Sequence, residues 1–91
     1  MPVITFANTK GGAGKTTAVL LLATELVQKG HRVTILDADP QQWITRWHKL
    51  SPANDRLNVI AYANSTTIER SINENRDTTD YFIVDLPGAR T

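Results

Sequence analysis

The residues best suited to chemistry lie in a glycine-rich run over positions 8–17, which reads NTKGGAGKTT. Its last part, Gly14-Lys15-Thr16, matches the end of the phosphate-binding pattern G-x-x-x-x-G-K-S/T. Glycines let backbone N–H groups turn toward phosphate oxygens, while Lys15 can reach the β- and γ-phosphates and the Thr16 hydroxyl can bind Mg²⁺. The pattern begins with a glycine where this chain has Thr9, and an additional lysine, Lys10, follows. Because such a loop needs one lysine for its own nucleotide, Lys10 suggests a second role.

Carboxylates follow two apolar segments further along the chain. Asp85 ends the run at 81–85, which has the form of a Walker B strand whose acid helps to hold Mg²⁺. Asp37 and Asp39 are one residue apart, so on an extended chain they would point the same way. Asp39 directly precedes Pro40, where it could orient an attacking water. Asp37 could instead support the magnesium shell or cap backbone N–H groups.

The elements that must position these residues alternate along the chain. We expect strands at 3–7, 32–37, 57–62 and 81–85, and helices at 17–29, 41–50 and 67–75. Gly30 should end the first helix, and Thr66 and Glu69 have capping-box spacing at the start of the third. This alternation predicts an α/β fold with a parallel sheet and helices on both faces. Ligands bind beyond the carboxyl ends of such strands, where the loop and all three acids lie.

Length and composition narrow the class of protein. The 91 residues predict one domain, and a net charge of +1 gives no global sign of nucleic-acid binding. The absence of cysteine excludes disulfides and thiolate chemistry within these residues. The longest apolar run, 18–23, is too short to span a membrane and there is no signal-peptide pattern, so we expect a cytoplasmic protein. Trp43 and Trp47 would share one helix face, which favours core or interface packing over stacking on nucleotide or DNA.

Three motifs resemble the ParA/MinD superfamily of P-loop ATPases, and they occur in the order of that family. Residues 10–17 resemble its deviant Walker A motif, residues 37–41 its second signature, and residues 83–88 its Walker B segment. The Asp-Pro-Gln ending of the second motif favours the ParA partition branch over MinD-like proteins. A P-loop strand that opens at Val3 is similar to that of the small, ParF-like ParA proteins.

The resemblance implies a role for each matching residue, with ATP or ADP and Mg²⁺ as cofactors. Lys10 corresponds to the signature lysine, which reaches the partner's ATP across a nucleotide-sandwich dimer. Lys15 and Asp39 would complete the catalytic set, with Asp39 positioning water. The nucleotide-binding positions are Lys10, Gly11, Gly12, Ala13, Gly14, Lys15, Thr16 and Thr17, and the magnesium positions are Thr16, Asp39 and Asp85.

The resemblance also implies a function. It predicts an ATP-binding and ATP-hydrolysing partition protein that drives plasmid or chromosome segregation through ATP-dependent homodimerisation. A ParB-like, centromere-binding partner would stimulate hydrolysis, and no membrane partner is expected. A P-loop phosphotransferase acting on a metabolite is disfavoured by Lys10 and by the Asp-Pro-Gln ending.

Similar proteins are considerably longer, so we expect residues 1–91 to form the N-terminal part of a larger domain. The regions that bind nonspecific DNA would be missing from it. The alternative function is a truncated, non-catalytic module that binds nucleotide phosphate or pairs with a full-length ParA-type partner. If residues 1–91 were the whole molecule, the last strand would be expected to present an open edge.

Overall fold

Strands and helices alternate along the chain in the order that the sequence predicts. The computed structural model describes residues 2–7, 13–51, 54–61 and 68–86. The elements are β1 (Val3–Phe6), α1 (Ala13–Gln28), β2 (Val33–Asp37), α2 (Trp43–Leu50), β3 (Leu57–Ala61), α3 (Ile68–Asn75) and β4 (Tyr81–Asp85). All strand pairs are parallel. The predicted α/β fold with a parallel sheet is therefore confirmed.

Two helices begin at other residues than the sequence indicated. Helix α1 starts at Ala13, four residues before the predicted start, so Lys15 and Thr16 of the loop lie in its first turn. Helix α2 starts at Trp43, because Gln42 adopts a left-handed conformation with φ of 51° and cannot lie inside a right-handed helix. The predicted capping box of α3 lies outside the described residues, since it includes Thr66.

The last strand is not at an edge of the sheet. The strand order is β1-β4-β2-β3, so β4 has β1 on one side and β2 on the other. The expectation that this strand presents an open edge is wrong. The physical reason is its composition: Phe82, Ile83 and Val84 are at most 2% exposed, and such an apolar strand is best covered in the middle of a parallel sheet.

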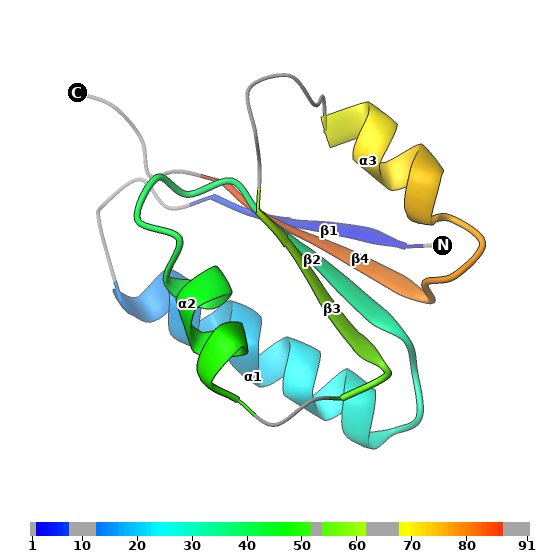
Figure 1. Ribbon diagram of the computed structural model, residues 1–91, viewed down its shortest axis with the longest axis horizontal. Coiled ribbons are helices and arrows are strands. Elements are labelled where there is room, and N and C mark those ends of the chain that lie inside the picture. Colours follow the sequence, from blue (N-terminus) through cyan, green and yellow to red (C-terminus); the bar gives the residue numbers. More distant parts are fainter. Residues whose placement is uncertain (1, 8–12, 52–53, 62–67, 87–91) are drawn as a thin grey trace.

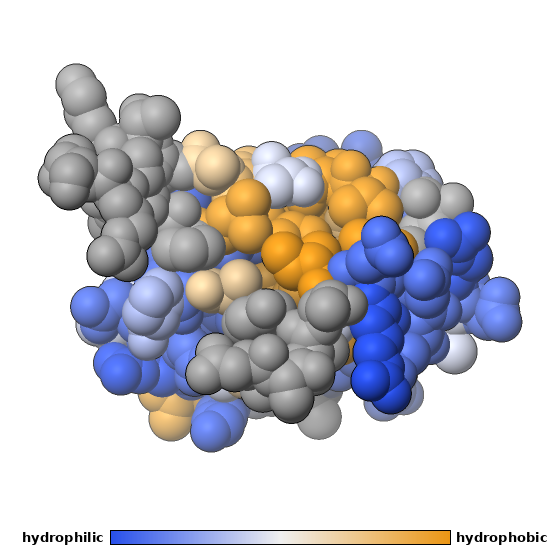
Figure 2. Space-filling model, turned by 90° about the horizontal axis from the view of Figure 1, so that it is seen from above, coloured by the Kyte–Doolittle hydropathy of each residue, from blue (hydrophilic) through white to orange (hydrophobic). Residues whose placement is uncertain are grey.

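The helices cover both faces of the sheet, as predicted. Helices α1 and α2 lie on one face and α3 lies on the other (Figure 1). The core on the α1 and α2 side includes Val19, Ile35, Ile44 and Ile83. The core on the α3 side is formed by Leu36, Phe82 and Val84, with Ile60, Ile68, Ile72 and Leu86 packed against it. Figure 2 shows that face from above, where apolar side chains gather beside the hydrophilic helix α3.

Gly30 ends α1, as the sequence indicated. It has a φ of +92°, a region that glycine enters without steric cost. The N–H of His31 donates to the carbonyl oxygen of Leu26 at 3.1 Å, and the N–H of Gly30 donates to that of Val27 at 3.0 Å. These two bonds form a Schellman motif, which satisfies the last carbonyls of the helix and turns the chain toward β2. Among the described helices, none has the length and apolar character needed to cross a membrane.

Candidate nucleotide-binding site

The strand register brings the predicted acids to one edge of the sheet. Asp37 at the end of β2 is the register partner of Asp85 at the end of β4. Side chains alternate between the faces of a strand, so both acids lie on the same face as Ile35 and Ile83, which pack in the core beneath α1 and α2. The first turn of α1 reaches this edge, which places Lys15 among the acids.

Lys15 binds two of the three predicted acids directly. Its Nζ lies 3.1 Å from Asp39 Oδ2 and 2.9 Å from Asp85 Oδ1, and it also donates to the carbonyl oxygen of Leu86. The Lys15 side chain is 5% exposed and that of Asp85 is 2% exposed. Three residues from distant parts of the chain thus form one ionic cluster, in which Lys15 and Asp85 are buried and Asp39 is partly exposed.

The pKa values of the cluster reflect burial and the opposing charges. Burial lowers the pKa of Lys15, but hydrogen bonds to Asp85 and Asp39 and the charges of those acids together raise it above its ordinary value. Burial raises the pKa of Asp39, but hydrogen bonds from the Gln41 N–H and from Lys15 bring it below its ordinary value. The cluster therefore contains a firmly protonated lysine and a firmly ionised Asp39.

Asp85 shifts in the opposite direction to Asp39, although both contact the same lysine. Burial raises its pKa most, the Lys15 hydrogen bond and charge offset part of this, and the negative charges of Asp37 and Asp39 raise it further. The net direction is upward. Asp85 is therefore the acid whose ionised form gains most from an additional positive charge.

Asp37 has a partner that the sequence did not indicate. Thr45 in the first turn of α2 donates its N–H to Asp37 Oδ2 at 2.9 Å and its hydroxyl to the same oxygen at 2.7 Å. Of the two roles predicted for Asp37, the structure shows the capping of a backbone N–H. No local motif joins residues eight apart, so only the packing of α2 against the sheet could reveal this pair.

Two buried carboxylate oxygens at this edge lack a hydrogen-bond donor among the described residues. Asp37 Oδ1 is buried and accepts no hydrogen bond from the described residues, and Asp85 Oδ1 is met there only by the Lys15 ion pair. Carboxylate oxygens are the ligands that Mg²⁺ prefers, and Mg²⁺ usually keeps waters and substrate phosphates in its shell. No group of three or more acids or histidines able to hold a metal occurs within the described ranges. The residues present therefore fit a Mg²⁺ ion that is also bound by phosphate better than a Mg²⁺ ion bound by protein ligands alone.

The remaining predicted site residues lie at or before the start of α1. Lys10, Gly11 and Gly12 lie outside the described residues, and for Ala13 only its place at the start of the helix is described. Gly14 and Thr17 are exposed, and Thr16 is half-buried. A Cβ added at Gly14 would meet nothing within 4 Å. Packing of the described residues therefore does not require glycine at this position.

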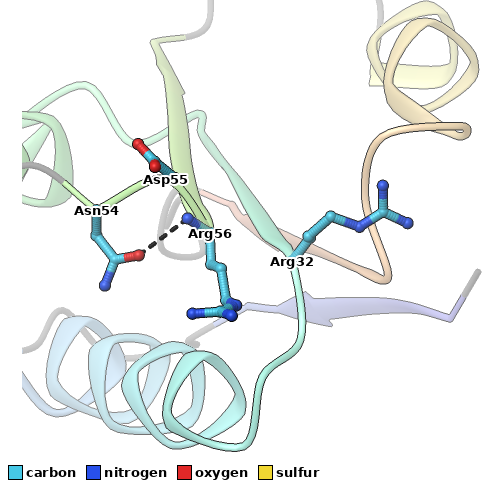
Figure 3. Close-up of a pocket in the computed structure, with 4 residues that line it drawn as sticks. All are labelled: Arg32, Asn54, Asp55 and Arg56. Atoms are coloured by element: carbon cyan, nitrogen blue, oxygen red, sulfur yellow. Dashed lines mark hydrogen bonds between the residues drawn. The ribbon is translucent and has the colours of Figure 1, made fainter.

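A separate hollow of about 540 Å³ lies at the amino ends of the strands, away from this cluster. Arg32, Asn54, Asp55 and Arg56 line it, and the N–H of Arg56 donates to Asn54 Oδ1 at 2.9 Å. Figure 3 shows the two arginine side chains pointing in different directions. The two guanidinium groups therefore do not converge on one point of this hollow.

Comparisons with known proteins agree with the geometry. A family model described as an AAA domain matches residues 1–89. Protein ParA of Rhizobium radiobacter is 36% identical over 97% of this chain and 40% of its own length. Protein virC1 of the same organism is 47% identical over 54% of this chain and 21% of its own length. The chromosome partitioning protein ParA of Caulobacter vibrioides (strain NA1000 / CB15N) is 54% identical over 43% of this chain and 15% of its own length.

The chain is thus shorter than the curated relatives that it matches, and it spans 40% of the Rhizobium radiobacter ParA. The match over residues 1–89 includes the loop, Asp39 and Asp85, so the family assignment and the ionic cluster concern the same residues. The chain belongs to the ParA/MinD family of P-loop ATPases, of which it covers only the N-terminal part.

Proposed function

We propose that this chain binds and hydrolyses ATP with Mg²⁺ and acts in plasmid or chromosome partition through ATP-dependent homodimerisation. The observation that carries the proposal is the contact of Lys15 with both Asp39 and Asp85. The names of the relatives, which include a ParA and a chromosome partitioning protein, support the partition role. The proposed partners are a second copy of the chain, a ParB-like centromere-binding protein, and nonspecific DNA through regions outside this segment.

Lys15 would exchange its partners when phosphate binds. Its ammonium group is held by two carboxylates and the Leu86 carbonyl oxygen. The β- and γ-phosphates of ATP offer a denser negative charge to the same cation. Release of Lys15 would free the oxygens of Asp85 for a metal, so that nucleotide and metal binding support each other.

Asp39 would orient the attacking water. The Gln41 N–H donates to its Oδ1 at 2.8 Å, which fixes the carboxylate on the turn after β2. The lowered pKa of Asp39 keeps it ionised, and an ionised carboxylate accepts hydrogen bonds from water. Once Lys15 has moved to the phosphates, Asp39 Oδ2 becomes available for this task.

Magnesium, when bound, would neutralise the charge of the phosphates, and Thr16, Asp39 and Asp85 are the residues that would hold it. Lys10 would act across the dimer, where an additional cation stabilises the charge that develops as the γ-phosphoryl group leaves. This chain's own part is to hold Lys15, the acids and Thr16 around its own nucleotide and to offer Lys10 to the nucleotide of the partner.

The decisive experiment measures magnesium-dependent release of phosphate from ATP by purified residues 1–91. We expect turnover that is lost in Lys15→Ala and kept in Lys29→Ala, a matched control because Lys29 is exposed at the other end of α1. Circular dichroism would show that both variants remain folded. If no Lys15-dependent turnover occurs, with or without DNA and a partner protein, the catalytic proposal fails for this chain. Binding of ATP without turnover would then favour the non-catalytic module.

A second experiment separates the two lysines of the loop. We expect Lys10→Ala to bind ATP as the wild type does but to lose ATP-dependent dimerisation, measured by sedimentation velocity with and without ATP. Lys15→Ala should lose ATP affinity itself. Equal loss of ATP affinity in the two variants would show that Lys10 serves its own nucleotide rather than the partner's.

A further inference from the structure

The layer formed by α1 and α2 presents large apolar side chains to solvent. Leu21 of α1 is 66% exposed, and Trp43 and Leu50 of α2 are 53% and 89% exposed. Among the described residues, the other large apolar side chain with such exposure is Val3 of β1. Single exposed apolar residues are common, whereas several on one layer indicate an interaction surface.

A groove of about 320 Å³ is lined by residues of α1, α2 and β3. Helix α1 contributes Thr24, Val27 and Gln28 to it, helix α2 contributes Trp47 and His48, and β3 contributes Leu57. Thr24 and Gln28 also border a neighbouring hollow that includes Leu21, so the concave surface continues along α1. The groove is large enough to receive an apolar side chain of another protein.

Helix α2 arranges three kinds of side chain in adjacent rows. Ile44 is fully buried and anchors the helix to the core. Trp43, Trp47 and Leu50 follow the i, i+4, i+7 spacing of one helix face, and Trp47 borders the groove. Arg46 is three residues after Trp43 and three before Lys49, so a row of cations runs along the side of the apolar row that faces away from the groove.

The charge of α2 is not balanced within the helix. Glu25 of α1 pairs with Lys29 directly after that helix, and within α3 Arg70 pairs with Glu74. Helix α2 contains no acid from Trp43 to Leu50. The Arg46 guanidinium lies 5.0 Å from the centre of the Trp43 ring, and Lys49 forms no ion pair with any part of the chain that the structure describes. The surface of α2 thus has an exposed row of apolar side chains next to a row of cations. It is complementary to a surface that has a row of apolar side chains next to a row of acids.

We propose that the α1–α2 surface, defined by Leu21, Trp43, Trp47, Leu50, Arg46 and Lys49 with the adjoining groove, is a docking site for an acidic amphipathic helix of a partner protein. The apolar face of that helix would cover Trp43 and Leu50 and insert one side chain into the groove next to Trp47. Its acids would pair with Arg46 and Lys49. This is helix-in-groove recognition, in which apolar contacts supply affinity and charges set orientation.

Lipid membranes and DNA also bind basic helices, but this surface fits an acidic protein helix better than it fits either of them. A lipid surface is flat at this scale and does not fill a groove lined by Val27 and Leu57. A DNA backbone pairs with cations but would leave Leu50 exposed to water. The proposal is independent of ATP, because none of these residues contacts the ionic cluster of Lys15, Asp39 and Asp85.

The two tryptophans of the chain are both on α2, so intrinsic fluorescence reports on this surface directly. The probes are two synthetic amphipathic helices without tryptophan that share one leucine face and carry either glutamate or lysine on the polar face. We expect the glutamate peptide to cause a saturable blue shift of tryptophan emission in residues 1–91 without nucleotide. The lysine peptide should bind at least about tenfold more weakly.

Variants identify the surface. Leu50→Ser should weaken the glutamate peptide roughly tenfold, because burial of one leucine is lost. Arg46→Glu/Lys49→Glu should abolish the preference for glutamate over lysine. Arg70→Glu/Arg76→Glu makes the same change of charge within α3 and directly after it, on the other face of the sheet, and should bind as the wild type does.

Three outcomes would overturn the proposal. The first is the absence of saturable binding by the glutamate peptide. The second is equal binding of the two peptides, which would show that charge does not select the partner. The third is a response to phosphatidylglycerol vesicles or duplex DNA without a response to the glutamate peptide, which would assign the surface to lipid or nucleic acid.

Discussion

The two ends of the sheet each hold an ion pair, and the pairs differ in their access to water. At the carboxyl ends of the strands, Lys15 Nζ lies 2.9 Å from Asp85 Oδ1, and the side chains are 5% and 2% exposed. At the amino ends, Arg32 Nη2 lies 3.0 Å from Asp80 Oδ1, with side chains 50% and 36% exposed. The two distances are nearly equal, so burial is what distinguishes the pairs.

The comparison shows why only one end is a candidate for chemistry. An exposed ion pair is screened by water and contributes little to stability, but it can tie the start of β2 to the start of β4. A buried ion pair loses its hydration and is held by its partners alone. When a ligand of higher charge density arrives, the buried lysine can exchange its partners. Perturbed pKa values in such a cluster are typical of functional sites.

The largest expected effect comes from breaking the buried pair. Lys15→Met keeps an unbranched side chain of similar size but leaves two carboxylates without their cation, so we expect a loss of roughly 3 kcal/mol in the free energy of unfolding. Urea denaturation at neutral pH measures it. The double variant Lys15→Met/Asp85→Asn should recover much of this loss, because it also removes the more deeply buried of the two charges that Lys15 contacts.

The matched change at the other end is Arg32→Met, which removes the cation of the exposed pair. We expect it to shift the urea midpoint much less than Lys15→Met does. Equal shifts would show that burial does not distinguish the pairs. A double variant no more stable than Lys15→Met would show that the unpaired acid is not the source of the loss.

The sequence predicted the residues of the carboxyl end better than their contacts. A strand followed by an acid is a local pattern, and parallel strands place their carboxyl ends together, so the meeting of Asp37, Asp39 and Asp85 could be expected. The strand order could not, because β4 joins β1 and β2 across long stretches of chain. The contact of Asp37 with Thr45 depends on how α2 packs, and no sequence spacing encodes that packing.

The amino end was not singled out at all. Arg32 and Asp80 are 48 residues apart, and the sequence indicates only the start of a strand at Arg32 and a polar turn at Asp80. Their pairing follows from the register of β2 and β4, which is known only once the strands are placed. The sequence thus identified the carboxyl ends of the strands, where a local motif marks the site. It did not identify the contacts at the amino ends, which arise from the topology of the sheet alone.

A smaller loss of stability is expected when a threonine hydroxyl is removed at either end of the sheet. Thr45 donates its hydroxyl to the buried carboxylate of Asp37, whereas Thr79 shares a hydrogen bond with the neutral hydroxyl of Thr34. Hydrogen bonds to charged groups contribute more than neutral ones, so we expect Thr45→Val to cost roughly 2 kcal/mol and Thr79→Val about 1 kcal/mol. Urea denaturation of both variants checks the order.

The neutral pair offers its own control. Thr34→Val/Thr79→Val removes both hydroxyls and leaves no buried partner unsatisfied, so it should be closer to wild type than Thr79→Val. Thr45→Val has no such rescue, since the buried Asp37 carboxylate loses a hydrogen-bond donor and stays in place. The reverse order of the two single variants would mean that the Asp37 carboxylate gains little from the hydroxyl.

The smallest expected effect is the pH dependence of the stability that the exposed Arg32–Asp80 pair contributes. A hydrogen bond from the Arg32 side chain, a second from its backbone N–H and the guanidinium charge lower the pKa of Asp80 to about 2 from an ordinary 3.8. Because the folded-state pKa is the lower one, this pair stabilises the fold above about pH 3.8, and the contribution is lost as the pH falls toward 2. The difference in urea midpoint between wild type and Asp80→Asn should therefore be constant from pH 7 to pH 5 and shrink below pH 4. A difference that persists unchanged at pH 3 would mean that Asp80 acts through its shape and hydrogen bonds rather than through its charge.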